Sequence, residues 1–146
     1  MTSFADRAGT WAGQNSFRLL ATDEPRPAPA SAVLGVQGPL TTLAYAWEHP
    51  TDGDQAGSLT VGPGPDDGSA VALWGDSWHQ APEAKVLTGH RDGASVTVGY
   101  DYAPGQWRWE ITLTATDDGL ELRMDNVPLE GDEERYAAMA ARLHRT

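Results

Sequence analysis

The segment 74–80, Trp-Gly-Asp-Ser-Trp-His-Gln, holds the densest group of chemically active side chains in the sequence. If it forms an extended strand, its side chains alternate between two faces, so Trp74, Asp76 and Trp78 lie together on one face. A carboxylate between two indoles can orient a cationic or hydrogen-bond-donating ligand while the rings supply contact area. The same carboxylate can instead cap a turn at the rim of a sheet, with both rings in the core. The segment is therefore a candidate binding site, with a structural role as the alternative.

The same segment does not favour a serine hydrolase. On a strand, Ser77 and His79 lie about 6.6 Å apart between Cα atoms, and Asp76 points to the opposite face. These three side chains would not form the hydrogen-bonded series of a Ser-His-Asp triad. A Gly-x-Ser-x-Gly nucleophile elbow is also absent from the sequence. A composite site that uses His49 or His90 stays open, but the sequence favours a protein that is not an enzyme.

The sequence predicts no metal site and no cofactor. It has no cysteine to supply thiolate ligands, and its four histidines are scattered without a His-x-x-x-His pair. The Asp-rich turns at 52–54 and 66–67 lack the ligand periodicity of a calcium loop and are typical of ordinary turns.

Short strands must position these residues, because large apolar residues recur at every second position. In the stretch 107–113, Trp-Arg-Trp-Glu-Ile-Thr-Leu, one face is large and apolar while the other is charged or hydroxylated, as a half-buried strand requires. The pairs Asp92-Gly93 and Asp118-Gly119 indicate hairpin turns whose residues adopt positive φ. The predicted strands cover residues 9–20, 31–37, 40–48, 56–63, 69–78, 84–90, 94–102, 106–115 and 119–127.

Two segments depart from this pattern. The Pro- and Ala-rich stretch 24–30 contains three prolines that cannot donate ladder hydrogen bonds, so we expect an extended loop. Residues 133–144 favour a helix on local propensity, yet closure of a barrel needs a final strand with Met139, Ala141 and Leu143 on one face. We favour the strand, because tertiary packing often overrides propensity, and the helix is the alternative.

The chain length suits a single domain, residues 1–146, with a sizeable core. Short turns join adjacent strands, and an open sheet of this many strands would leave its edges unpaired. The sequence therefore predicts an all-β fold, a closed antiparallel up-and-down β-barrel of about ten strands with little helix.

The charge and hydropathy of the sequence argue against two classes of partner, nucleic acids and membranes. Ten Lys and Arg against 21 Asp and Glu give a net charge of −11, so long-range repulsion argues against nucleic acid and membranes as partners. No run approaches the roughly 18 apolar residues of a membrane span. The absence of cysteine fits a reducing compartment, and we expect a cytoplasmic protein.

The start of the chain, Gly9-Thr10-Trp11 followed by Gly13, and its Arg-rich end at 141–145 resemble the calycin superfamily of lipocalin-like barrels. The resemblance implies that the tryptophan closes the barrel floor. It also implies that Arg142 or Arg145 packs over the ring through a cation–π contact.

Within the calycins, the chain most resembles nitrobindin-like barrels and the DUF1579-type bacterial proteins of uncharacterised function. The segment 74–79 is similar to a Trp-Gly-Asp-Ser-Trp-His signature of the DUF1579-type group. Nitrobindins bind haem through a histidine on the last strand, but the matching stretch 136–142 contains no histidine, and His144 lies close to the chain end. We therefore expect no haem, and no Soret shift when the purified protein is mixed with hemin.

Several polar residues fall where strands meet loops. Glu48-His49 and Asp125-Asn126 are expected to surround an opening of the barrel. Arg18 and Arg108 fall on faces opposite the large apolar groups, which predicts that they point to solvent. The alternative is that a bulge reverses the register, which would make them interior anchors for a carboxylate.

If the aromatic faces all point inward, the barrel has an aromatic interior with a few polar groups. This predicts non-catalytic binding of an apolar or aromatic small molecule. The alternative is a packed barrel that mediates protein association or homodimerisation without such a ligand. The candidate ligand-binding residues are Tyr45, Trp47, Trp74, Asp76, Trp78, Tyr100, Trp107, Trp109 and Asn126.

Overall fold

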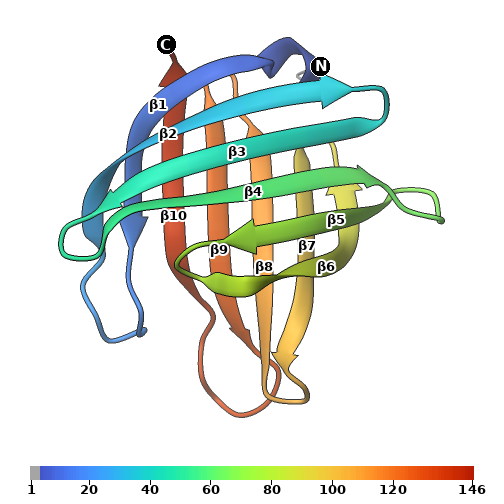
Figure 1. The fold of residues 1–146 in the computed structure, drawn as a ribbon. Coiled ribbons are helices and arrows are strands. Elements are labelled where there is room, and N and C mark those ends of the chain that lie inside the picture. The colour runs from blue at the N-terminus through green and yellow to red at the C-terminus, as the bar shows by residue number, and fades with distance from the viewer. Residues whose placement is uncertain (1–3) are drawn as a thin grey trace.

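Ten antiparallel strands close into a barrel in the computed structural model, which describes residues 4–146 except the side chain of Ala81 (Figure 1). A short 3-10 helix, η1 (Phe4–Arg7), precedes the first strand. The strands are β1 (Gly9–Phe17), β2 (Arg26–Gln37), β3 (Leu40–His49), β4 (Gly53–Pro63), β5 (Ser69–Asp76), β6 (Gln80–Asp92), β7 (Ser95–Ala103), β8 (Trp107–Ala115), β9 (Leu120–Pro128) and β10 (Tyr136–Arg145).

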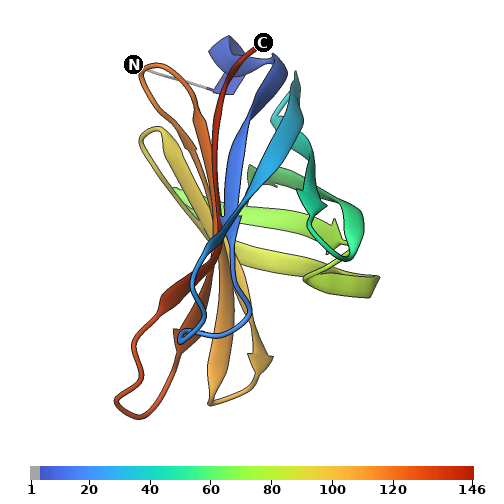
Figure 2. The same ribbon diagram turned by 90° about the vertical axis from the view of Figure 1, so that its left-hand side faces the viewer.

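The barrel is an up-and-down meander. Each strand pairs with its sequence neighbours, and β1 closes the ring by pairing with both β2 and β10. Both termini lie at the same end of the barrel, and β3, β4 and β5 cross in front of the later strands (Figure 1). In the view turned by 90°, these strands lie to one side of β8 to β10 (Figure 2). The predicted all-β closed barrel of about ten strands is confirmed.

Alternation along each strand builds the core. In β8, Trp109, Ile111 and Leu113 are buried, while the residues between them are partly exposed. Most strands send alternate apolar side chains inward in this way, which is the period-2 pattern of a sheet with one wet face, whereas β6 contributes only Leu87 of its described side chains to the core. No helix among residues 4–146 combines the length and apolar character needed to cross a membrane.

The Pro- and Ala-rich stretch is a strand, so the expectation of a loop over 24–30 is wrong from residue 26 onward. Pro27 and Pro29 pair with β1, whereas β2 begins to pair with β3 only at Ala30. This first part of β2 therefore has one unpaired edge. Because proline lacks a backbone N–H, it can occupy positions on that edge without the loss of a hydrogen bond between strands. The alanines between the prolines turn inward, and Ala28 is buried.

The tail is strand β10 and not a helix, which confirms the favoured prediction. Met139, Ala141 and Leu143 are all buried on the inner face. The register with β9 shifts just before Met139, and this irregularity turns Ala138 inward as well.

Both Asp-Gly hairpins form, but not with the turn geometry expected. Gly93 has a φ of 61°, whereas among the described residues no non-glycine has positive φ, so Asp92 does not. Gly119 has no positive φ. It is needed for close approach instead, because a Cβ there would lie 2.3 Å from the carbonyl oxygen of Leu143.

The end of the barrel near the termini is closed by Trp11, which is 1% exposed. Its Nε1 donates to the carbonyl oxygen of Arg7 at 2.8 Å, and the Arg145 guanidinium lies 4.7 Å from the ring centroid. The same guanidinium donates to the carbonyl oxygens of Ala8 and Asp6. Arg145 and not Arg142 therefore packs over the ring.

Candidate functional site

The opposite end of the barrel is built by five loops, which join β1 to β2, β3 to β4, β5 to β6, β7 to β8 and β9 to β10. We call this end the mouth. The β5–β6 connection is three residues long and consists of Ser77, Trp78 and His79.

Asp76 ends β5 and folds the chain into a tight turn. Its Oδ1 accepts hydrogen bonds from the backbone N–H groups of Trp78 (2.7 Å) and His79 (2.8 Å). An aspartate that binds the backbone two and three residues ahead favours a turn over a continued strand. The predicted strand 69–78 therefore ends two residues early.

This turn reverses the expected direction of His79, which the alternation of a strand had placed on the face opposite Asp76. The imidazole points inward, and its Nδ1 lies 3.2 Å from Oδ2 of Asp76. Both side chains are buried, at 5% and 0% exposure. Ser77 turns away and bonds to Gln55 and to the backbone N–H of Ala56, so the three residues do not form a triad.

A buried network surrounds the Asp76 carboxylate. The hydroxyl of Tyr45 donates to Oδ2 of Asp76 at 2.5 Å, and Nε1 of Trp74 donates to that hydroxyl at 2.9 Å. With His79 on the same oxygen, each carboxylate oxygen accepts from two donors. Asp76 therefore caps the turn and organises the buried network, which is the role that the structural alternative for segment 74–80 gives it.

The electrostatics of this network favour an ionised carboxylate. Burial alone would raise the pKa of Asp76, but hydrogen bonds from His79 and Tyr45 outweigh it, and the pKa lies below its ordinary value. Burial raises the pKa of Tyr45 well above 10.0, and the adjacent Asp76 charge raises it further. The network thus pairs an ionised carboxylate with a neutral phenol.

Gly57 on β4 makes room for this network. It pairs with Tyr45 on one side and Asp76 on the other. A Cβ at this position would lie 2.3 Å from the Tyr45 hydroxyl oxygen. Only glycine lets that hydroxyl cross the strand and reach the carboxylate.

Above the network lies a hollow of about 300 Å³, which we call the aromatic cavity. Its inner wall includes Trp74 and Trp109, whose rings stack with centroids 5.9 Å apart. The aromatic cavity is lined by Arg18, Leu19, Trp74, Trp78, His79, Gln80, Tyr100, Tyr102, Trp109, Asn126 and Ala138.

Two nitrogens of this lining are buried without a hydrogen-bond partner, Nε2 of His79 and Nε1 of Trp109. Their ring centroids are 5.4 Å apart. Buried polar atoms are nearly always paired, so these two nitrogens make the aromatic cavity a candidate ligand site. The other unpaired buried atoms, on Arg7, Asn15 and Trp47, lie outside its lining.

The polar groups at the outer part of the aromatic cavity are, by contrast, satisfied. The Tyr100 hydroxyl donates to Gln80 at 2.7 Å, and the Tyr102 hydroxyl donates to Asn126 at 2.6 Å. The amide of Asn126 donates in turn to the hydroxyl of Tyr136. These bonds hold the wall in place.

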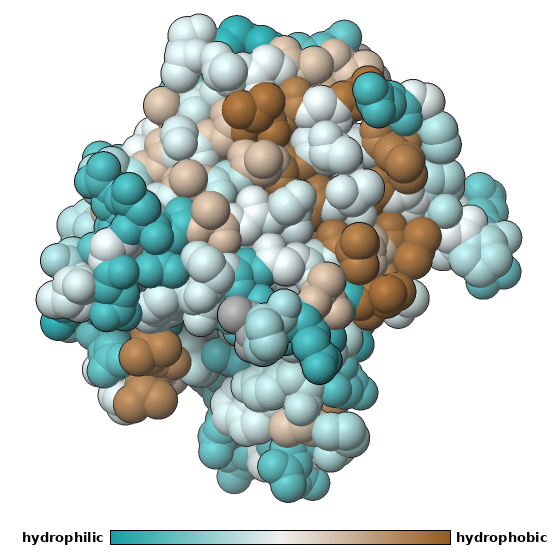
Figure 3. All heavy atoms as spheres, viewed as in Figure 1, coloured by the Kyte–Doolittle hydropathy of each residue, from teal (hydrophilic) through white to brown (hydrophobic). Residues whose placement is uncertain are grey.

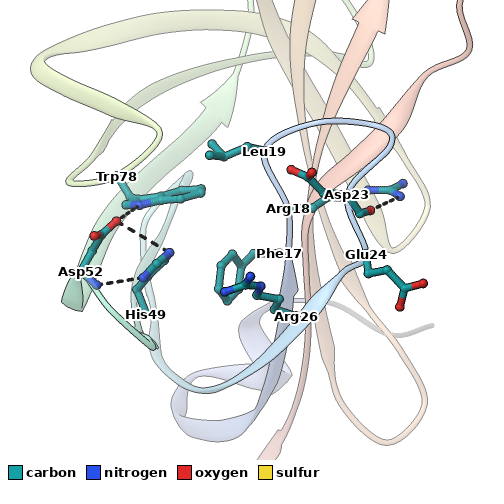
Figure 4. Close-up of a pocket in the computed structure, with 9 residues that line it drawn as sticks. All are labelled: Phe17, Arg18, Leu19, Asp23, Glu24, Arg26, His49, Asp52 and Trp78. Atoms are coloured by element: carbon teal, nitrogen blue, oxygen red, sulfur yellow. Dashed lines mark hydrogen bonds and ion pairs between the residues drawn. The ribbon is translucent and has the colours of Figure 1, made fainter.

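A second hollow of about 410 Å³ lies beside the first, and we call it the outer hollow (Figure 4). Trp78, His49 and Asp52 form one side of it, and the β1–β2 loop with Arg18 forms the other (Figure 4). The outer hollow is lined by Phe17, Arg18, Leu19, Asp23, Glu24, Arg26, His49, Asp52 and Trp78.

Trp78 lies between the two hollows and lines both. Its Nε1 donates to Asp52 at 3.1 Å, and its ring packs edge-on against Trp47 with centroids 5.3 Å apart. His49 also packs against this ring, which places it at the mouth as expected.

The structure brings five of the candidate residues into the lining of the aromatic cavity: Trp74, Trp78, Tyr100, Trp109 and Asn126. Tyr45 and Asp76 lie in the network beneath it, and Trp47 packs against Phe17 and Trp78. Trp107 is partly buried at the start of β8 and lines neither hollow.

Sequence reasoning missed His79 as a lining residue and placed Arg18 inside the barrel only as the alternative. The signal for His79 was Asp76-Ser77, a pair typical of turns, which would have shifted the histidine to the inner face. Arg18 was expected on the exterior of a strand, but β1 ends at Phe17 and the guanidinium lies over the Tyr136 ring, 5.3 Å from its centroid.

The described residues do not fit a haem held from the last strand. His144 is exposed on β10, and the inward positions of that strand carry Ala138, Met139, Ala141 and Leu143. Within residues 4–146, no three His, Asp or Glu side chains cluster in a way that could hold a metal ion.

No family model matches this chain, and no curated protein matches it. Its fold is similar to the crystal structure of Rv2717c from M. tuberculosis, with a TM-score of 0.60 and 15% sequence identity, over 95% of this chain and 92% of that one. At this identity the likeness shows the fold alone. The closed ten-strand barrel fits a calycin-like fold.

Proposed function

We propose that this barrel binds an aromatic or otherwise apolar small molecule in the aromatic cavity, without a chemical step. The observation that carries the proposal is the pair of buried, unpartnered nitrogens on His79 and Trp109 beside one indole-lined hollow. Ligand sites typically combine apolar walls with a few convergent polar groups, and their volumes begin at about 300 Å³. This volume suits a molecule of two fused rings better than a long lipid.

We also propose that the chain is a DUF1579-type barrel, because segment 74–79 is similar to the Trp-Gly-Asp-Ser-Trp-His signature of that group. The segment forms both the turn after Asp76 and part of the cavity wall. The last strand supports a departure from haem-binding nitrobindins. We place the protein in the cytoplasm, since a chain without cysteine suits a reducing compartment.

Binding can be tested with N-phenyl-1-naphthylamine, a neutral probe whose fluorescence rises in apolar surroundings. We expect saturable enhancement with the wild-type protein. The variant Trp109→Leu removes one wall of the aromatic cavity and should weaken binding about tenfold. Trp107→Leu is the matched control, because it lies on the same strand outside both hollows, and should leave the affinity unchanged. Absence of saturable binding to the wild-type protein would refute the proposal.

A second candidate function, homodimerisation, is favoured by an apolar patch on the outer face. Figure 3 shows apolar side chains gathered over strands β3 to β6. Leu40, Val71, Leu73 and Val86 are 37% to 67% exposed there and surround a shallow depression without charged residues. Two chains that each carry a charge of −11 repel least where they meet through an uncharged patch.

Sedimentation velocity tests this second candidate. A dimer of the wild-type protein should dissociate in the variant Leu73→Glu, because an unpaired charge would enter the contact. Leu129→Glu, an exposed position in the β9–β10 loop, is the control and should leave the dimer intact. A wild-type protein that sediments as a monomer at about 100 μM excludes the dimer.

A further inference from the structure

We propose that the aromatic cavity selects a hydroxylated aromatic ligand, a phenol, whose single oxygen donates its proton to Nε2 of His79 and accepts a hydrogen bond from Nε1 of Trp109. This inference rests on the proposed binding function and adds the chemical class of the ligand.

The protons of the buried network assign the role of Nε2. Tyr45 and the two backbone N–H groups of the turn already donate to the Asp76 carboxylate. An ionised carboxylate can only accept, so the Nδ1 of His79, at 3.2 Å, must carry the proton of their bond. In the neutral imidazole the other nitrogen, Nε2, is then an acceptor with a free lone pair.

The indole of Trp109 supplies the opposite role. Its Nε1–H can only donate, and it has no acceptor in the protein. The two rings lie 5.4 Å apart between centroids and line the same hollow. The interior thus offers one acceptor and one donor side by side, both buried and both unfilled.

A hydroxyl group is the smallest ligand group that completes both atoms, because one oxygen donates once and accepts through its lone pairs. An ether can only accept, which would leave Nε2 of His79 unpaired. An ammonium can only donate, which would leave the Trp109 N–H unpaired. The cost of burying an unpaired group makes such a site reject the wrong analogue more strongly than it attracts the right one.

Charge excludes an anionic ligand as the preferred class. The Asp76 carboxylate lies directly behind the His79 ring, and the chain as a whole carries a charge of −11. Arg18 lies at the outer part of the aromatic cavity, but its guanidinium already binds backbone carbonyl oxygens and the Tyr136 ring. A neutral phenol meets both the hydrogen-bonding and the charge requirements.

The other walls of the aromatic cavity explain why the hydroxyl group should be attached to an aromatic ring. Stacked Trp74 and Trp109 form a flat surface, and Trp78 stands at the outer side. Flat rings bury the most area against flat walls, with an added preference for offset or edge contacts.

Isothermal titration calorimetry with three matched probes tests the inference: 2-naphthol, 2-methoxynaphthalene and naphthalene. We expect wild-type protein to bind 2-naphthol about 10- to 100-fold more tightly than the methyl ether, because only the phenol donates to Nε2. In His79→Phe the preference should fall below about twofold. Trp107→Phe, at a position that lines neither hollow, is the control and should keep the preference.

His79→Phe also removes a donor from Asp76, so Trp109→Phe provides a test that leaves that network intact. It should weaken binding of both oxygen-containing probes about tenfold and leave naphthalene within about twofold, because only the oxygen atoms used the N–H. Far-UV circular dichroism confirms that each variant keeps the barrel.

The outcomes separate the two proposals. Equal affinity of wild-type protein for the phenol and the ether, or an undiminished preference in folded His79→Phe, overturns the phenol inference alone. Binding of none of the three probes by wild-type protein overturns the binding function together with it.

Discussion

The two ends of the barrel both carry buried tryptophan, yet they treat its N–H in opposite ways. At the closed end, Trp11 donates to a backbone carbonyl and lies beneath the Arg145 guanidinium. At the mouth, Trp109 has no acceptor, and the nearby His79 has no partner for its Nε2. The aromatic content of a barrel end therefore does not identify a candidate binding site; the mouth differs because two unpaired nitrogens there line one hollow.

Trp11 has a structural role, and the proposed function gives Trp109 a role in recognition. A fully bonded side chain stabilises the fold and has nothing left to offer a ligand. An unbonded one costs stability in the free protein, and that cost is recovered when a ligand supplies the missing group. Substitutions at the two ends should thus separate stability from binding.

The largest effect is expected for Trp11→Ala, which empties the closed end. Loss of a buried indole should lower the free energy of unfolding by about 3–5 kcal/mol. Urea denaturation followed by circular dichroism measures it. Binding of 2-naphthol to the fraction that stays folded should be unchanged, and a loss of affinity in that fraction would contradict the division between the ends.

Asp76→Asn should cost about 1.5–3 kcal/mol at pH 7, because hydrogen bonds to a charged group are lost. The substitution also tests the pH dependence of stability. The pKa of Asp76 in the folded protein lies below the ordinary value of 3.8, so its contribution is complete above pH 3.8 and disappears as the pH falls further. Between pH 5 and about pH 2 the wild-type protein should lose more stability than the variant. Equal acid sensitivity would show that the carboxylate is not stabilised as its contacts indicate.

Gly57→Ala should act on the mouth from the neighbouring strand. The added methyl would collide with the Tyr45 hydroxyl and separate it from Asp76, at a cost of about 1–3 kcal/mol for the broken buried bonds. Thermal unfolding measures the loss. The double variant Gly57→Ala with Tyr45→Leu should lose less stability than the sum of the two single variants, because both the hydroxyl and the ring carbons that collide with the methyl are gone. Additive losses would argue against the collision.

Arg145→Met gives the smallest expected effect, about 1–2 kcal/mol from the cation–π contact and two hydrogen bonds to backbone carbonyls. Arg142→Met is the control, since its side chain is 83% exposed and faces a surface glutamate at 3.7 Å. Thermal unfolding of both variants distinguishes them, and equal melting temperatures would remove the special role of Arg145.

The sequence predicts the barrel well because alternation is a local property. Residues 107–113 alternate cleanly, and β8 forms there with the expected inner face. The need to close the sheet also predicts the last strand correctly, against the helical propensity of residues 133–144. Patterns that repeat along many residues tolerate an error at any one of them.

The site was predicted less well because single side chains decide it. One Asx turn at Asp76 moves His79 from the expected outer face to the inner one. Pro27 and Pro29 were wrongly placed in a loop. A strand accepts proline only where one of its edges has no partner, and the sequence of the strand itself does not show which edge that is. Neither fact follows from the local composition.

The closure of one barrel end by Trp11 has a consequence for the kinetics of binding. Because the indole and Arg145 close that end, the proposed ligand would enter and leave through the mouth, past Trp78 and the β1–β2 loop. Substitutions at Trp78 and the β1–β2 loop would then change the residence time of the ligand, whereas substitutions at His79 and Trp109 would change which ligand is bound. The two properties could therefore change independently.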